Sequence, residues 1–371
     1  MAPREDCILL LQGGGALGSY QAGAYEALAA HGFAVDWVAG ISIGAINAAI
    51  IAGNPPQMRV ARLEQFWHLA SSGVSGAPML DASLARMFSN EVSAAYVAAN
   101  GAPGFFSPRV VPPTFFSSGQ PQALSYYDTA PLRETLERLI DFDLLNSGRV
   151  RISVGAVDVR TGNFAYFDSA QRKLDVRHIM ASGALPPGFT PVEIDGEYYW
   201  DGGLVSNTPL QYVTDMIGLR HDATIFQIDL FPARGPMPRT LYEAVGREKD
   251  IRYSSRTRLN TDVAKEKLER RKALRDLLAR LPDEFQQDPQ VRGLRERYES
   301  TPAIALVHLI YRDRNYETQA KDYLFSRQAI LDHWEGGKRD VDKTFHHPAW
   351  HDCAARREPG IAVYDLTGEQ S

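Results

Sequence analysis

The sequence predicts an α/β protein built on a mostly parallel β-sheet that is covered by helices. The first fifty residues alternate between short apolar runs, typical of buried strands, and longer helical patterns: strand 6–12, helix 19–32, strand 33–40 and helix 44–53. Glycines stand at both strand-to-helix junctions. This alternation requires crossover connections, which produce parallel strands with helices on the sheet faces.

The remaining elements are assigned from local patterns. An Asp195-Gly196 pair supplies the turn of a hairpin over 191–203. Further segments are predicted as helices at 54–70, 129–146 and 321–345, as two strands around a Thr-Gly turn within 150–169, and as strands at 223–232 and 303–312.

Residues 100–128 are rich in glycine and proline and carry paired phenylalanines at 105–106 and 115–116. A loop of this length in a compact domain is often a lid or a binding loop. The alternative is an ordered surface loop that tucks its aromatic rings into the core. The sequence leaves both interpretations open.

Residues 247–280 hold twelve Lys/Arg and six Asp/Glu in a chain whose net charge is −5. Such a basic helix is interpreted either as an attachment to an anionic membrane or granule surface, or as a solvated helix or dimer contact. We expect the second. A homo-oligomer therefore stays open, as does peripheral membrane contact.

Composition excludes several classes of protein. The net charge of −5 gives no bias toward nucleic acid. Two cysteines do not make a disulfide framework, and Cys7 is expected to be a buried apolar residue. The apolar run at 7–11 is too short for a signal peptide, and no stretch approaches the length of a membrane span, so we expect a cytoplasmic protein.

Ser42 is the candidate nucleophile. Gly40-Ile41-Ser42-Ile43-Gly44 matches the G-x-S-x-G pattern between a predicted strand and a predicted helix. A nucleophile there sits on a sharp turn with its Oγ exposed, and the flanking glycines Gly40 and Gly44 let neighbouring backbone approach closely. A purely structural turn serine is the alternative.

Gly13, Gly14 and Gly15 form the first glycine-rich turn, which exposes backbone N–H groups to a negative charge. Together with Gly18 they also satisfy G-x-G-x-x-G, so a dinucleotide site of an oxidoreductase is a competing hypothesis. That hypothesis needs an acidic residue at the end of the second strand, whereas Asp36 precedes WVAG and so begins or interrupts that strand. An oxyanion hole facing Ser42 is the other interpretation.

A serine nucleophile needs a base, and Asp201 follows the predicted hairpin, with Gly202 and Gly203 supporting its turn. The histidines give no comparable signal: His308 lies in an apolar strand and is expected to be a satisfied core residue. The stretch HHPAWHDC lacks the regular spacing of metal ligands, so neither a metal nor a cofactor is predicted.

Three motifs in order, GGGALG, GISIG and DGGLVSNTPL, with ASGALPPGF leading into the last, resemble the patatin-like phospholipase family over residues 5–230. The resemblance implies a three-layer α/β/α fold and a Ser–Asp dyad without histidine. Ser42 would be the nucleophile, Asp201 the base and the Gly13–Gly15 turn the oxyanion hole. It further implies a catalytic domain at 5–232.

A mainly helical C-terminal extension at 233–371 would pack on or cap that domain, because IRYSSRTR, KDYLFSR and HWEGGKRD resemble an extension of a bacterial subgroup. The substrate would be a lipid or another acyl ester, hydrolysed through an acyl-enzyme.

An unshifted aspartate is a weak base at neutral pH, so we expect burial to raise the pKa of Asp201. The family often has Arg or Lys where this chain has Leu17, which weakens the assignment of a phospholipid substrate but not that of an ester hydrolase. Phospholipids, neutral lipids and stored polyesters stay open. The alternatives are a non-catalytic lipid- or granule-binding protein on the same fold, an α/β-hydrolase with a triad histidine, and the oxidoreductase.

Overall fold

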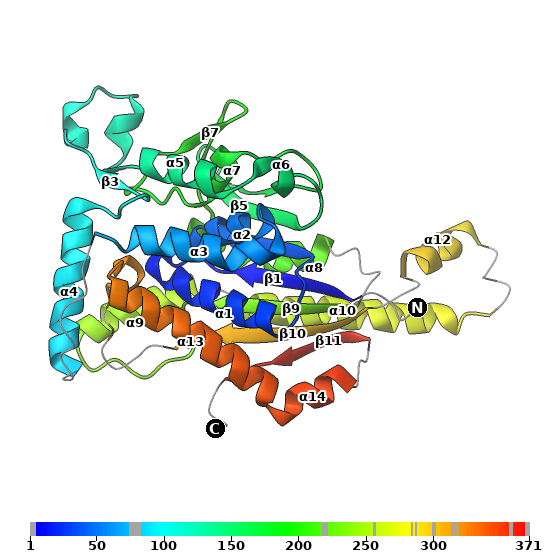
Figure 1. Ribbon diagram of the computed structural model, residues 1–371. Helices are drawn as coiled ribbons and strands as arrows, with labels where there is room; N and C mark the ends of the chain where they lie inside the picture. The colour runs from blue at the N-terminus through cyan, green and yellow to red at the C-terminus, as the bar shows by residue number, and fades with distance from the viewer. Residues whose placement is uncertain are drawn as a thin grey trace.

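The computed structural model describes residues 5–73, 83–216, 222–254, 257–282, 285, 288–298, 302–312, 317, 319–355 and 359–367. Within these residues one large sheet runs through the molecule (Figure 1). Its strands are β1 (Asp6–Leu11), β2 (Trp37–Ile41), β5 (Arg151–Asp158), β6 (Phe164–Asp168), β7 (Val192–Ile194), β8 (Glu197–Asp201), β9 (Ala223–Asp229), β10 (Ala303–Ile310) and β11 (Gly360–Tyr364).

The strand order in the described part of the chain is β11-β10-β9-β1-β2-β5-β8-β7, with β6 also paired to β5. The six strands from β11 to β5 are mutually parallel. The pairs β5–β6, β5–β8 and β7–β8 are antiparallel. The sheet is therefore mostly parallel, as predicted, with an antiparallel edge.

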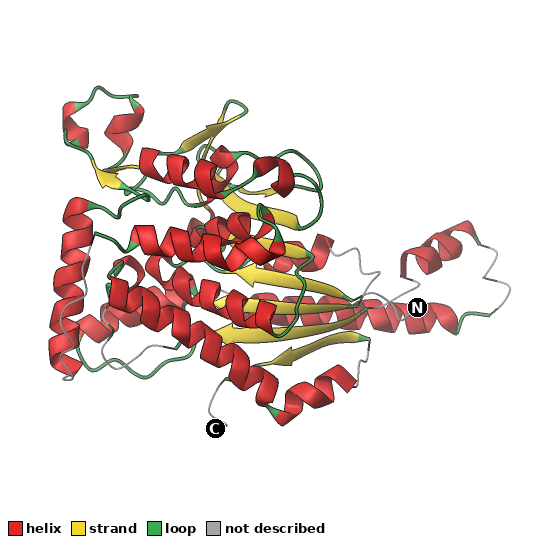
Figure 2. Ribbon diagram, viewed as in Figure 1, coloured by secondary structure: helices red, strands yellow, loops and turns green. Residues whose placement is uncertain are grey.

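Helices cover both faces of the sheet (Figure 2). They are α1 (Gly18–Ala30), α2 (Ile43–Ala52), α3 (Pro56–Ala70), α4 (Ser83–Asn100), α5 (Ala130–Leu139), α6 (Phe142–Leu145), α7 (Val176–Ser182), α8 (Leu210–Met216), α9 (Leu241–Tyr253), α10 (Thr257–Ala279), α12 (Pro289–Tyr298), α13 (Arg327–His346) and α14 (Pro348–Ala355). Short 3₁₀ turns are η1 (Gly15–Leu17), η2 (Pro113–Phe115), η3 (Pro121–Leu124), η4 (Gly202–Leu204) and η5 (Lys321–Tyr323). A separate ribbon pairs β3 (Ser107–Pro108) with β4 (Tyr127–Asp128).

Strand β1 explains why the fold has three layers. Its residues alternate between two cores: Leu9 and Leu11 pack into the core that contains α1, α2 and α3, whereas Ile8 and Leu10 pack into the core that contains α8 and Leu268 of α10. A strand segment that is buried on both faces is expected to be apolar, and β1 is both buried and apolar from Cys7 to Leu11.

The segment beyond residue 232 contributes to the same sheet. β10 pairs with β9, and β11 pairs with β10. Helix α13 crosses α1 at very short range: a Cβ built on Gly23 would lie 1.9 Å from the Trp334 carbonyl oxygen, and one on Gly337 would lie 2.0 Å from that of Tyr20. These two glycines let the helix backbones touch. The division at residue 232 stays a prediction.

The structure departs from the expected elements in several places. The predicted helix 321–345 starts as the 3₁₀ turn η5, and α13 begins only at Arg327, where the side chain of Ser326 caps it. The predicted helix 129–146 is two helices, because the side chain of Asp141 caps α6 and ends the first helix. Helix α4 was not predicted. In the loop 100–128, Phe105 and Phe106 are buried, as the second interpretation expects, whereas Phe115 is 78% exposed. The interpretation of the loop as a lid stays a prediction.

Candidate active site

Ser42 sits on a strained turn between β2 and α2. Its φ of 56° and ψ of −123° lie in a region of backbone conformation that residues other than glycine rarely adopt. The following helix α2 points its N-terminus at this residue, which favours negative charge beside it. The predicted strand–turn–helix context of the serine is confirmed.

The two glycines that flank Ser42 are required by close contacts. A Cβ built on Gly40 would lie 2.3 Å from the carbonyl oxygen of Gly44, and one on Gly44 would lie 2.2 Å from that of Leu11. Neither position can hold a side chain without moving backbone. The turn over residues 40–44, which we call the elbow, therefore packs directly against the end of β1, where the first glycine turn begins.

Ser182 supports the elbow from α7, a role that the sequence reasoning missed. The backbone N–H of Ser42 donates to the Ser182 Oγ at 3.0 Å, and that hydroxyl donates to the carbonyl of Gly155 at 2.6 Å. Ser182 is fully buried. Its only signal in the sequence was its place in ASGALPPGF; in the structure it is the last residue of α7.

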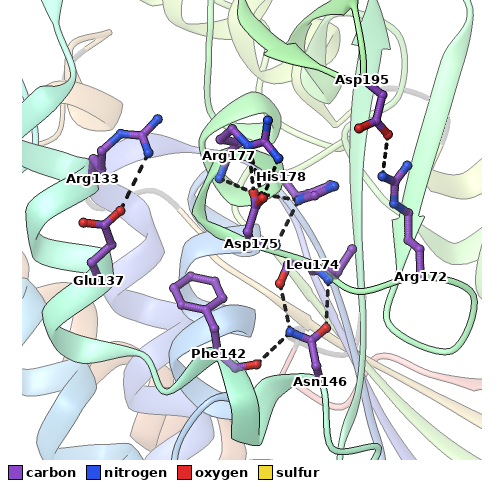
Figure 3. Close-up of polar contacts among 10 residues, drawn as sticks. All are labelled: Arg133, Glu137, Phe142, Asn146, Arg172, Leu174, Asp175, Arg177, His178 and Asp195. Carbon is purple, nitrogen blue, oxygen red and sulfur yellow. Dashed lines mark hydrogen bonds and ion pairs between the residues drawn. The ribbon is translucent and has the colours of Figure 1, made fainter.

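The N-terminal end of α7 is held in place by polar contacts, drawn in Figure 3. The His178 Nδ1 accepts the backbone N–H of Asp175 at 3.0 Å, which closes a capping box. Asn146 bridges to the preceding Leu174 with bonds of 2.9 Å and 2.8 Å. These contacts fix the register of the helix that delivers Ser182.

Asp201 ends β8 and is only 2% exposed. Its carboxyl group accepts a hydrogen bond of 2.7 Å from the Gly203 N–H, and the Ser42 hydroxyl lies near enough to the same carboxyl group to lower its pKa. Burial nevertheless raises the pKa of Asp201 to about 7, because desolvation outweighs the effects of Ser42 and Gly203. The structure thus brings Ser42 and Asp201 together, with the raised pKa that the sequence argument required.

Gly202 and Gly203, which follow Asp201, are each required as glycine for a different structural reason. A Cβ on Gly202 would lie 2.6 Å from the Gly155 carbonyl oxygen, so this turn packs on β5. Gly203 supplies the N–H that binds the carboxylate, and a Cβ there would stand 3.1 Å from both Asp201 Oδ1 and Asn207 Oδ1.

The Gly13–Gly15 turn lies against Ser42. A Cβ built on Gly13 would lie 3.0 Å from the Ser42 Cβ. The Gly13 N–H is directed to the carbonyl of Asn207 at 3.4 Å. Within the described residues, no hydrogen bond engages the backbone N–H groups of Gly14 and Gly15, and Gly15 has a φ of +55°.

Gln12 and Asn207, which the sequence reasoning did not assign, hold this turn. The Asn207 Nδ2 donates to the Gly13 carbonyl at 3.0 Å. The Gln12 Oε1 accepts the N–H groups of Leu230 and Phe231 at 2.6 Å and 3.0 Å. Both residues are buried polar groups. The signals available in the sequence were the place of Gln12 at the end of an apolar run and that of Asn207 within DGGLVSNTPL.

Other candidate residues lie away from the site. The carboxylate of Asp36 accepts the Cys7 N–H at the amino end of β1, so it is not at the strand end where a ribose anchor belongs. His308 is buried as expected, but within the described residues its Nε2 has no hydrogen-bond partner. In the part of the chain described here, no three His, Cys, Asp or Glu side chains gather as a metal site.

Comparisons with known proteins agree with the sequence motifs. The family profile described as patatin-like phospholipase matches residues 9–214, which is more than half of the chain. A second profile, described as patatin phospholipase, matches residues 251–357 in the C-terminal segment. No protein in the curated set matches the sequence.

Among solved structures, VipD from Legionella pneumophila is 15% identical, with 92% of this chain and 67% of that chain covered and a TM-score of 0.39. ExoU from Pseudomonas aeruginosa, in complex with SpcU, is 18% identical, with 78% and 60% covered and a TM-score of 0.29. The chain thus spans two thirds or less of the length of these proteins. With TM-scores below 0.5, these likenesses do not bear on its function.

Proposed function

Because the chain belongs to the patatin-like phospholipase family, we propose that it hydrolyses lipid acyl esters with Ser42 as nucleophile and Asp201 as general base. The observation that carries this proposal is the proximity of the Ser42 hydroxyl to the carboxyl group of Asp201, which is buried and whose pKa burial raises to about 7. A base with a pKa near the working pH combines a large ionised fraction with adequate basicity.

The proposed reaction has two halves. Asp201 accepts the hydroxyl proton while the Ser42 Oγ attacks the ester carbonyl carbon. The N–H groups of Gly14 and Gly15 bind the oxygen that becomes negative, and Gly13, whose own N–H is bonded to Asn207, forms the wall beside Ser42. Collapse of the tetrahedral intermediate transfers the Asp201 proton to the departing alcohol and leaves the acyl group on Ser42.

Deacylation repeats these steps with water. Asp201 takes a proton from the water molecule that attacks the acyl-enzyme, and the same glycine N–H groups bind the second oxyanion. The proton then returns to the Ser42 Oγ, and the carboxylic acid leaves. No histidine is needed at any step.

A lipid rather than a small polar ester is supported by the surroundings of the turn. Leu204 and Val205 directly follow the Asp201 turn and are 47% and 41% exposed, so an acyl chain could lie against them. Leu17 is fully buried, so this position supplies no cation for a phosphate group. We therefore propose an acyl-ester hydrolase. The substrates tested below determine which head group it accepts.

Peripheral contact with a lipid surface belongs to the same proposal, and α4 is the element that supports it. Phe88, Val92 and Tyr96 recur every four residues and are 73%, 53% and 47% exposed. α4 stands on the side to which the carboxyl ends of the parallel strands point (Figure 1). The basic helix is a weaker candidate, since Arg270 pairs with Glu266.

Co-sedimentation with anionic vesicles tests that placement. We expect Phe88→Ser and Val92→Ser to reduce the bound fraction, with Arg270→Ser as the matched control. Loss of binding only in the arginine variant would move the contact to α10.

The enzymatic proposal is tested with p-nitrophenyl esters from acetyl to palmitoyl, followed by phospholipid vesicles, a triacylglycerol emulsion and a hydroxyalkanoate polyester. We expect Ser42→Ala and Asp201→Asn to lose turnover, and Ser42→Ala to lose labelling by a fluorophosphonate. Ser147→Ala and Asp143→Asn, on the α6 turn, are the matched controls. Turnover that survives Ser42→Ala in a folded protein would refute the assigned nucleophile.

A further inference from the structure

Two dipeptides of identical sequence, Lys249-Asp250 in α9 and Lys321-Asp322 in η5, pair crosswise. The Lys249 Nζ lies 2.5 Å from the Asp322 Oδ1, and the Lys321 Nζ lies 2.6 Å from the Asp250 Oδ1. The side chains of the first pair are 15% and 16% exposed, and those of the second pair 2% and 7%. We call these four residues the crossed pairs.

The crossed pairs are charged and constrained. Burial disfavours the Lys249 ammonium, but the adjacent Asp322 carboxylate outweighs this effect and raises the pKa of Lys249. The same ammonium donates to the Gln319 carbonyl at 3.1 Å and to the Tyr323 hydroxyl at 3.2 Å. Removing one partner would therefore leave a charge with little access to water, which is strongly unfavourable.

The η5 side of the crossed pairs touches the glycine turn. A Cβ built on Gly15 would lie 2.1 Å from the carbonyl oxygen of Asp322. The main chain at the crossed pairs is thus in direct contact with the residue whose N–H is a proposed oxyanion donor. Gly15 has to be glycine both for this contact and for its φ of +55°.

The α9 side reaches the same turn by hydrogen bonds. The carbonyl of Tyr253, three residues after Asp250, accepts from Asn207 at 3.0 Å and from Gln12 at 3.2 Å. Asn207 in turn donates to the Gly13 carbonyl. The Tyr253 ring packs on Phe231 at 5.2 Å, and a Cβ on Gly14 would lie 3.2 Å from the Phe231 ring.

We propose that the crossed pairs are positioning residues for the oxyanion hole: by locking α9 to η5 they hold the Gly13–Gly15 turn between Tyr253 and Asp322. The segment beyond residue 232 is then a working part of the active site rather than an appendage. This inference rests on the proposed function. It also gives a role to IRYSSR and KDYLFSR, which supply Tyr253 and the η5 half of the crossed pairs.

The test is a charge exchange. Lys249→Asp and Asp322→Lys are made singly and together, and acylation is followed with a p-nitrophenyl ester well below each unfolding temperature. We expect each single variant to lose about 10–100-fold in kcat with little change in KM, because a displaced donor acts on the transition state. The double exchange should recover part of the loss. If a charge-reversal variant does not fold, Asp322→Asn takes its place, because it keeps the shape of the side chain and removes its charge. The same loss of kcat is expected for it.

Two readouts separate positioning from mere stabilisation. The rate of labelling by a fluorophosphonate, whose phosphoryl oxygen would occupy the oxyanion hole, should fall in parallel with kcat. Amide hydrogen exchange in a peptide covering residues 12–17 should rise. The midpoint of the pH–rate profile should stay in place, since Asp201 keeps its contacts. Lys267→Asp, which breaks the exposed pair with Asp215, is the matched control and should change none of these.

If the single variants fold and their kcat, labelling rate and hydrogen exchange are unchanged, the inference is overturned. The proposed function would still stand in that case, provided that turnover depends on Ser42. Turnover that persisted in Ser42→Ala would overturn both.

Discussion

Replacing Asp201 by asparagine should abolish hydrolysis and also make the folded protein more stable above neutral pH. Burial raises the pKa of Asp201 from 3.8 to about 7. A shift of roughly three units corresponds to ~4 kcal/mol, at ~1.4 kcal/mol per unit. This is the free energy that opposes folding when the buried carboxylate must be ionised. Asparagine keeps the size and an acceptor for the Gly203 N–H, but it carries no charge.

The pH dependence identifies the cause. Folded protein holds the Asp201 proton more tightly than the unfolded chain does, so this stabilising contribution is fully present below the unfolded pKa of 3.8 and is lost as the pH rises through about 7. The advantage of Asp201→Asn should therefore be small near pH 4 and approach ~4 kcal/mol, as an upper value, near pH 8.

Urea unfolding followed by circular dichroism near pH 5 and near pH 8 measures this difference, with ester hydrolysis assayed on the same preparations. Asp229→Asn is the matched control, because Asp229 is also buried with its pKa raised to about 7 but lies outside the dyad. It should show a similar pH-dependent gain and retain turnover. A variant at position 201 that is less stable than wild type at both pH values, or whose difference does not change with pH, would refute the reasoning.

Three further predictions concern the same site. The kcat/KM for ester hydrolysis should rise with pH to a plateau with a midpoint at about 7, falling to roughly a tenth one unit lower, because Asp201 must be ionised; a profile that is flat between about pH 5 and pH 9 would contradict this. Gly15→Ala should lower kcat by about 10²-fold or more, since its Cβ would meet the Asp322 carbonyl oxygen at 2.1 Å, whereas Gly32→Ala, with φ of +84° and open space around it, should cost only stability. Ser182→Ala should cost about 1–3 kcal/mol in urea unfolding and lower kcat, because the Ser42 N–H and the Gly155 carbonyl lose their shared partner; an unchanged kcat would mean that the elbow holds its strained shape unaided.

The N-terminal half of the fold was predictable because its signals are local. A short apolar run, a glycine turn and a helical pattern follow one another twice, and each strand is buried on both faces. The same locality made Ser42 and its two glycines predictable, since the turn that strains the serine is encoded within five residues. The hairpin before Asp201 followed in the same way from Asp195-Gly196, both of which have positive φ.

The parts that failed depend on distant partners. α4 was missed because two of its buried positions, Ser93 and Ala94, are small, while Phe88, Val92 and Tyr96 are exposed. Ser182 looks like any small helix residue until the fold places Ser42 beside it. His308 was expected to be satisfied, yet its buried Nε2 has no hydrogen-bond partner within the described residues.

The crossing of α1 and α13 has a consequence for how the protein is made. Glu26 of α1 accepts from the Trp334 indole N–H, 308 residues later, and Gly23 lies against the Trp334 carbonyl. At ~5–20 residues per second, a ribosome needs roughly 15–60 s to make that stretch. During this interval the helix that begins at the glycine turn has no neighbour for one of its faces. Ser42 and its turn are therefore translated long before α13, and the face of α1 that packs on α13 stays uncovered in the nascent chain until that helix has been made.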